Sequence, residues 1–188
     1  FDFSIEASAT TEKYSHKEIN VLKVGQRNST DCALVSVVSI EGGLFGVSEK
    51  VAYSAVINTN LGTTSKKPRD NCIQSWPQLG YEKTANCSIE DIYKQLANNK
   101  PCIVHRKKGE SEHWAVVYGY KGSKTQLEKS GFLVMNPTRD GGKYTTYDKW
   151  SSGWTVDRLA IRKTGVKIAN SFNISLGDVT NKTNTSAT

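Results

Sequence analysis

The chain has 188 residues, of which 37% are hydrophobic and 23% charged, and it carries a formal net charge of +7 at pH 7. This length fits one domain with a sizeable core, and no stretch reaches the roughly 18 apolar residues that a membrane span requires. The densest basic groups, Lys66–Lys67–Arg69 and Arg106–Lys107–Lys108, fall in predicted loops and lack the interleaved aromatic residues of a single-strand nucleic-acid groove. We therefore expect neither a nucleic-acid partner nor a membrane span.

The four cysteines, Cys32, Cys72, Cys87 and Cys102, are too few and too widely spaced for a disulfide-stapled scaffold. They form no Cys-x-x-Cys pair, and no histidine lies at zinc-ligand spacing from another ligand, so we expect neither a metal ion nor a cofactor. Cys72 and Cys87 have two interpretations, a disulfide in an oxidising compartment or two small buried side chains. Cys102 lies in a predicted strand and is expected in the core.

Helical patterns fill the first half of the chain after a polar arm over residues 1–20. Thr30 or Asp31, either of which is a good N-cap, begins a helix that ends at Gly42–Gly43. This helix is apolar on nearly all sides, so we expect it at the centre of the molecule. Cap and stop signals predict two further helices, one from Ser48 and one from Ser88 to Asn98–Asn99.

After Pro101 the spacing becomes that of strands rich in Val, Ile, Tyr and Trp. Four strands are predicted, over residues 101–105, 113–120, 131–136 and 155–162. Alternating apolar residues further on predict that 166–176 adds an edge strand or packs across the sheet, whereas the low-complexity end, 181–188, is predicted to be disordered. Helices followed by an antiparallel sheet indicate an α+β domain over residues 21–163, flanked by the arm and by a C-terminal strand and tail over 164–188.

Cys32 lies in the first turn of the central helix. The positive end of the helix dipole and the unpaired N–H groups there favour the thiolate, which is the attacking form of cysteine. An isolated cysteine at such a place is more often a buried structural residue. The polar residues that follow along the chain are what favour Cys32 as a nucleophile.

His113 opens a predicted strand after a polar turn, where a base can point off a rigid sheet. The next strand ends in Asn136, and if the two strands pair, Asn136 accepts from the second nitrogen of His113 and sets its tautomer. The order Cys, His, Asn is that of papain-like enzymes. The side-chain amide of Gln26, with the backbone N–H of Cys32, can form an oxyanion hole. His16 in the arm and His105 beside a basic turn are expected elsewhere, and His105 is expected to be exposed.

Four segments resemble bacterial peptidases that remove double-glycine leaders from bacteriocins, and resemble the free-standing relatives of those peptidases still more; they are Gln26–Ile40, Ile92–Val104, His113–Gly119 and Phe132–Pro137. The resemblance covers residues 21–163 and implies a papain-like cysteine peptidase fold. It also implies Cys32 as nucleophile, His113 as base, Asn136 as the residue that orients the base, and Gln26 as oxyanion donor. Ala33 stands where these peptidases usually have Gly, and Asn136 where Asp is more usual. No transporter spans or ATPase motifs follow, which puts a transporter-coupled role in doubt.

The resemblance implies a hydrolase that cleaves a peptide or amide bond in a peptide or protein substrate through a thioester acyl-enzyme. A deamidase or transamidase on the same scaffold remains an alternative, as does a peptide-binding module without catalysis. A degenerate relative that lacks the cysteine is such a module in toxin secretion, and the retention of Cys32 argues against that role here. We expect most of the four tryptophans in the core, with Trp150–Trp154 as the exposed segment. The missing initiator Met and the polar tail favour a secreted or cell-surface protein, or an effector delivered to another cell, and the resemblance implies a bacterial one.

Overall fold

The computed structural model describes residues 16–59, 76–85, 87–122 and 130–168 of the chain. The helices and strands of these residues are, in chain order, β1 His16–Glu18, α2 Cys32–Phe45, α3 Glu49–Thr59, β2 Tyr81–Thr84, α5 Ile89–Ala97, β3 Cys102–Lys108, β4 Ser111–Lys121, β5 Phe132–Asn136, β6 Lys143–Thr146, α6 Tyr147–Ser151 and β7 Thr155–Arg162. No helix in these ranges is long and apolar enough to cross a membrane.

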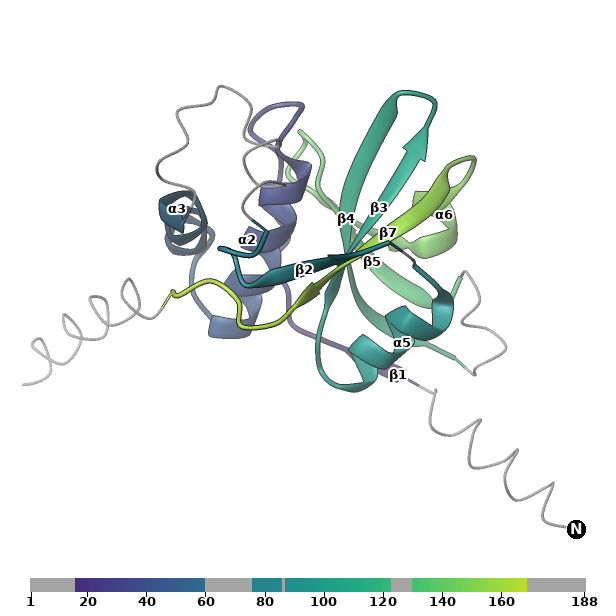
Figure 1. The fold of residues 1–188 in the computed structure, drawn as a ribbon, viewed down its shortest axis with the longest axis horizontal. Coiled ribbons are helices and arrows are strands. Elements are labelled where there is room, and N and C mark those ends of the chain that lie inside the picture. Colours follow the sequence, from purple (N-terminus) through teal and green to yellow (C-terminus); the bar gives the residue numbers. More distant parts are fainter. Residues whose placement is uncertain (1–15, 60–75, 86, 123–129, 169–188) are drawn as a thin grey trace, which may run out of the picture.

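The described strands form one seven-stranded antiparallel sheet in the order β2, β7, β3, β4, β5, β6, with β1 paired to the end of β4. Figure 1 shows α2 and α3 side by side and away from α5 and α6. Helices on the faces of an antiparallel sheet confirm the predicted α+β class. Residues 16–18 of the predicted arm are part of the sheet, because β1 pairs with β4.

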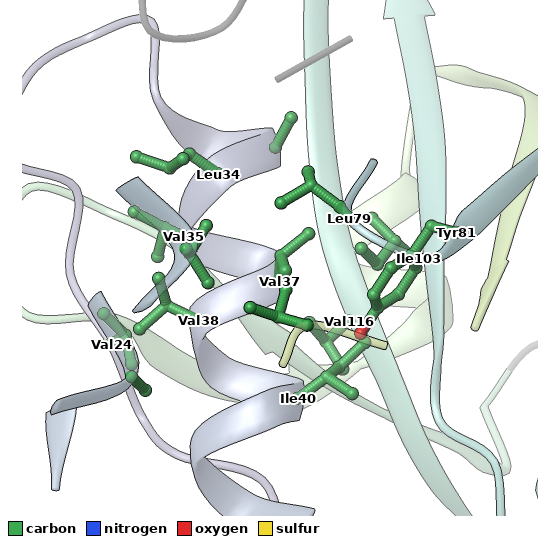
Figure 2. Packing of buried hydrophobic residues seen from close by; sticks show 14 of the residues in the cluster. Val24, Leu34, Val35, Val37, Val38, Ile40, Leu79, Tyr81, Ile103 and Val116 are labelled. Atoms are coloured by element: carbon green, nitrogen blue, oxygen red, sulfur yellow. The ribbon is translucent and has the colours of Figure 1, made fainter. Parts of the chain in front are cut away.

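The helix α2 lies at the centre, as its apolar sequence predicts. Every residue from Cys32 to Gly43 is buried, because α3 covers one side of α2 and the sheet the other. Figure 2 shows the side chains of this core, with Val37 and Ile40 directed toward Ile103 and Val116 of the sheet. The helix runs two residues beyond the predicted stop and ends at Gly46, whose φ of 64° is the left-handed conformation that favours glycine.

A second core lies on the opposite face of the sheet, under α5 and α6. Alternation along β3 divides its side chains between the two cores: Ile103 packs on the α2 side, and Cys102 and Val104 pack on the α5 side. The helix α5 begins with the predicted capping box, in which Ser88 and Asp91 bond reciprocally to each other's backbone N–H. Cys102 is therefore a core residue, as predicted.

Besides β1, three short elements are absent from the sequence predictions, namely β2, β6 and α6. Their sequences are largely polar, and pairing with longer strands stabilises β2 and β6. The prediction of a loop at Arg106–Lys108 is wrong, because β3 continues through Lys108 and joins β4 by a two-residue turn at Gly109–Glu110.

The C-terminal segment is joined to the α2 core as far as it is described. Val166 and Ile168 are buried there, without forming a strand. Glu41 of α2 accepts a hydrogen bond from the backbone N–H of Val166 and pairs with Nε of Arg162 at 2.8 Å. The remainder of the strand predicted over 166–176, and the tail predicted over 181–188, lie outside the described residues.

Of the cysteines other than Cys32, the described residues include Cys87 and Cys102. Cys87 is half-buried and not in a disulfide, and it packs in the same core as Cys102. Burial raises the pKa of the Cys87 thiol to about 12 and that of the Cys102 thiol well above its ordinary value. Cys72 lies outside the described residues, and the free, half-buried Cys87 favours the second interpretation, a small packed side chain, over the disulfide.

Candidate active site

Cys32 is the first residue of α2 and only 3% exposed. Its backbone therefore lies at the end of the helix where the first N–H groups have no intrahelical acceptor. The thiol belongs to the core on the α2 side of the sheet, together with Trp114 of β4. Cys32 is thus in the first turn of the central helix, where the sequence predicts it.

Asp31, one of the two predicted N-caps, occupies the N-cap position, but its side chain makes no cap hydrogen bond. The carboxylate is 1% exposed and accepts instead from the backbone N–H groups of Arg27 and Asn28, at 3.2 and 3.4 Å. The hydroxyl of Tyr53 on α3 donates to the same carboxylate at 3.1 Å. Asp31 thus fixes the loop that leads into Cys32 rather than the helix itself.

His113 and Asn136 meet where β4 begins and β5 ends. Nε2 of His113 lies 2.6 Å from Oδ1 of Asn136, which is the hydrogen bond expected from the sequence. Because an amide oxygen only accepts, this bond places the proton on Nε2 and leaves Nδ1 as the basic nitrogen. Burial lowers the pKa of His113 below its ordinary value; the hydrogen bond to Asn136 raises it, and the charge of Arg106 lowers it.

Two loops bring Cys32 and Asn136 into one region. The backbone N–H of Gln26 donates to the carbonyl of Thr138 at 2.8 Å. A Cβ atom added to Gly25 would lie only 2.5 Å from the Cα of Gly141, so the two backbones are in direct contact. The loop before α2 is therefore packed on the loop after β5. The side-chain amide of Gln26 donates to the carbonyl of Asn28 at 3.1 Å, within its own loop.

Arg106 is a further residue of this region that was not predicted from the sequence. It is the direct cross-strand partner of His113 in the β3–β4 hairpin. Burial lowers the pKa of Arg106 to about 10, while the Cys32 thiolate raises it, so the guanidinium interacts electrostatically with both Cys32 and His113. The two-residue turn at Gly109–Glu110 is the signal that would have placed Arg106 opposite His113.

The other two histidines form no bond with Asn136, although the charge of His105, besides burial, lowers the pKa of His113. His16 is exposed at the opposite end of β4, facing Lys121, roughly 25 Å along the strand from His113. His105 is 1% exposed, which corrects the expectation of an exposed side chain. Its Nδ1 lies 2.5 Å from Oδ1 of Asp157, and its ring packs on Trp114 with 4.5 Å between centroids.

Three of the four tryptophans, Trp76, Trp114 and Trp150, are buried in the core. Only Trp154 is partly exposed, so the expectation of an exposed 150–154 segment holds for Trp154 and is wrong for Trp150. Within the described part of the chain, no group of three His, Cys, Asp or Glu side chains is arranged to hold a metal ion.

The model of the Peptidase_C39 like family matches residues 27–156, which include Cys32, His113 and Asn136. The chain belongs to this family. The family was the one expected from the sequence, and its α+β, papain-like peptidase fold is the fold found here. The protein is accordingly a cysteine peptidase-like hydrolase.

Two solved structures are similar to this family member. One is a double-glycine motif protease from an AMS/PCAT transporter in complex with the leader peptide, at 16% identity, with a TM-score of 0.49, covering 77% of this chain and 91% of that chain. The other is the peptidase domain of Streptococcus ComA, a bi-functional ABC transporter involved in a quorum-sensing pathway, at 18% identity, with a TM-score of 0.47, covering 78% and 99%. A search of curated proteins found no match.

Proposed function

We propose that this family member cleaves a peptide or amide bond with Cys32 as nucleophile, His113 as base and Asn136 as the residue that orients the base. The observation that carries the proposal is the 2.6 Å bond between His113 and Asn136, formed beside the loop that leads into Cys32. Nδ1 of His113 takes the thiol proton, and the thiolate attacks the substrate carbonyl. The expected separation of the Cys32 sulfur and a His113 ring nitrogen in the reacting enzyme is about 4 Å or less.

The remaining steps follow from the same two groups. The protonated His113 gives its proton to the leaving amine as the C–N bond breaks, which leaves a thioester on Cys32. Water then attacks the thioester, with His113 as base, and releases the acid and the free thiol. The backbone N–H of Cys32 and the amide of Gln26 stabilise the oxyanion, provided that the amide turns away from the Asn28 carbonyl that it now contacts.

The lowered pKa of His113 supports its role as base. A ring whose pKa lies below its ordinary value of about 6.5 is neutral at pH 7 and ready to accept the thiol proton. The position of Cys32 at the start of α2 supports a reactive thiolate. By contrast, the Cys87 and Cys102 thiols have raised pKa values and stay protonated.

Thiol reactivity tests the proposal without knowledge of the substrate. Iodoacetamide at neutral pH should alkylate Cys32 at least about 10-fold faster than Cys87 or Cys102, with each site quantified by peptide mass spectrometry. His113→Ala should slow the alkylation of Cys32, and His16→Ala, at the far end of β4, is the matched control. A Cys32 thiol that reacts no faster than the buried cysteines would favour a peptide-binding module instead.

Turnover is tested with peptide libraries and peptidoglycan fragments, using wild type beside Cys32→Ala. New termini in the products indicate hydrolysis, a gain of 1 Da at Gln or Asn indicates a deamidase, and joined peptides indicate a transamidase. Identical products from Cys32→Ala and wild type would move the function to another site.

A further inference from the structure

Arg106 projects from β3 beside the proposed catalytic pair. Directly opposed residues on antiparallel strands have Cβ atoms about 5 Å apart on the same face of the sheet. Arg106 and His113 are such a pair. The register of β3 against β7 shifts between His105 and Arg106, which marks a local irregularity at this residue. The guanidinium therefore lies next to His113 on a rigid hairpin, not on a loop.

Two tryptophans enclose the guanidinium. Its central carbon lies over the ring of Trp150 at 4.8 Å and over the ring of Trp154 at 4.2 Å from the centroids. Both rings come from α6 and the turn that follows it, which Gly153 closes with a φ of 73°. Aromatic faces attract a cation but accept no in-plane hydrogen bonds, so this enclosure fixes Arg106 while its donors remain available.

Two buried donors at this place lack acceptors among the described residues. Nε of Arg106 and Nε1 of Trp150 are both buried, and neither has a hydrogen-bond partner there. No carboxylate in the described ranges lies within ion-pair distance of Arg106, although other arginines, such as Arg162, have one. A half-buried guanidinium without a counter-ion is costly, and a planar carboxylate is the group that its donors match best.

We propose that Arg106 binds a carboxylate of the substrate next to the bond that Cys32 attacks. The inference rests on the proposed function and specifies its substrate class, a peptide with a carboxylate close to the scissile bond. Two sources supply this group, the side chain of an Asp or Glu residue and the free C-terminus of the peptide. Arg106 is therefore a specificity-determining residue that contacts substrate.

Two alkylating reagents of nearly equal size provide the first test. Iodoacetate carries a carboxylate, and iodoacetamide carries a neutral amide. The rate of alkylation of Cys32 by iodoacetate, divided by the rate by iodoacetamide, therefore reports an anion site beside the sulfur. In wild type we expect this ratio to exceed that of N-acetylcysteine in the same buffer by about 10-fold, as one charge-assisted hydrogen bond provides. A ratio equal to that of N-acetylcysteine overturns the inference, whether or not any variant folds.

Variants then assign the effect to Arg106. Arg106→Met keeps an unbranched side chain between the two tryptophans and should lower the ratio to that of the free thiol, while Arg106→Lys should retain part of it. Lys107→Gln is the matched control, because it removes one positive charge from the next residue, which is exposed and points to the other face. An unchanged ratio in a folded Arg106→Met, checked by thermal unfolding, contradicts the assignment.

Cleaved peptides distinguish the two sources of the carboxylate. Replacing the acidic residue by its amide, or the free C-terminus by a C-terminal amide, should lower kcat/KM by about 10-fold to 100-fold for whichever group Arg106 binds. The same change should have little effect in Arg106→Met. If neither replacement matters in wild type while Cys32 remains reactive, the carboxylate inference fails and the proposed function stands. If Cys32 is unreactive toward both reagents, the proposed function fails.

Discussion

At the scale of single residues, burial and the charge of Arg106 lower the pKa of His113, while the hydrogen bond to Asn136 raises it. The base must be neutral to take the thiol proton, so activity is lost as pH falls through its pKa. Because that pKa is lowered, kcat/KM should hold down to a pH below about 6.5. Arg106→Met removes a positive charge that disfavours the imidazolium, so the pKa of His113 should rise and the acid limb should move to higher pH. The dependence of kcat/KM on pH, measured with an uncharged peptide, checks this. An acid limb at the same pH in Arg106→Met and wild type would contradict an effect of the Arg106 charge on the pKa of His113.

Asn136 orients the ring of His113 but does not react. Asn136→Ala should therefore leave partial activity, whereas His113→Ala should leave none. Asn136→Asp keeps an acceptor for Nε2 and adds a negative charge, so it should be more active than Asn136→Ala and raise the pKa of His113. Steady-state kinetics over pH 4–9 compare the three variants. Equal loss in Asn136→Ala and Asn136→Asp would mean that the bond to His113 does not matter.

Gln26 is engaged with Asn28 before any substrate binds. If its amide turns to meet the oxyanion, Gln26→Ala should lower kcat about 100-fold or more, with a smaller change in KM. Ser29→Ala, an exposed change in the same loop, is the control and should leave kcat unaltered. A kcat of Gln26→Ala within about twofold of wild type would leave the oxyanion to backbone donors alone.

The sequence predicts Cys32, His113 and Asn136 together because each is a polar or reactive residue at a sharp boundary of a helix or strand. Such boundaries leave local signals, including caps, turns and the end of an apolar run. The enclosure of Arg106 leaves no local signal, because Trp150 and Trp154 lie more than 40 positions further along the chain. The role of Asp31 was missed for a related reason. A carboxylate before a helix normally accepts from the first N–H groups of that helix. Here the packing of α3 instead places the Tyr53 hydroxyl where it donates to the Asp31 carboxylate.

At the scale of elements, the long strands and the helices α2, α3 and α5 follow their periodicity and caps closely. The short β2 and β6 do not, since their polar residues become strands only by pairing with β7 and β5. The length of β3 was underestimated at Lys107 and Lys108, where charge suggested a loop. Exposed strand ends of a hairpin accept charged side chains, so composition alone does not mark the turn.

The contact between the two loops of the site is a backbone contact at Gly25. A methyl group there would lie 2.5 Å from the Cα and 2.8 Å from the N of Gly141, and neither atom can move without shifting its loop. Gly25→Ala should thus separate the loop before Cys32 from the loop after Asn136. We expect a lower melting temperature and at least about a 10-fold loss of kcat/KM, since small misplacements of reacting groups are costly. Ser29→Ala serves again as control, and full activity in Gly25→Ala would show that the loops need not touch.

At the scale of the whole molecule, Glu41 joins the first helix of the site to the end of the last strand. Its carboxylate is fully buried between Arg162 and the backbone of Val166. Burial raises the pKa of Glu41, and Arg162 and Val166 oppose this by favouring the carboxylate. Cys32 lies at one end of α2, and Glu41 with its contacts to Arg162 and Val166 lies toward the other. The C-terminal segment therefore helps to hold the nucleophile helix on the sheet.

Truncation tests this role of the C-terminal segment. A chain that ends at residue 164 loses the buried side chains of Val166 and Ile168, at about 1.5–3 kcal/mol each. It also leaves one carboxylate oxygen of Glu41 without its backbone donor, a loss of about 1.5–3 kcal/mol. We therefore expect a much lower free energy of unfolding in urea, with reduced activity, whereas a chain that ends at residue 180 keeps all these contacts and should match wild type. If the shorter chain instead keeps its stability and gains activity, the segment is an inhibitory tail over the site and not a support for α2.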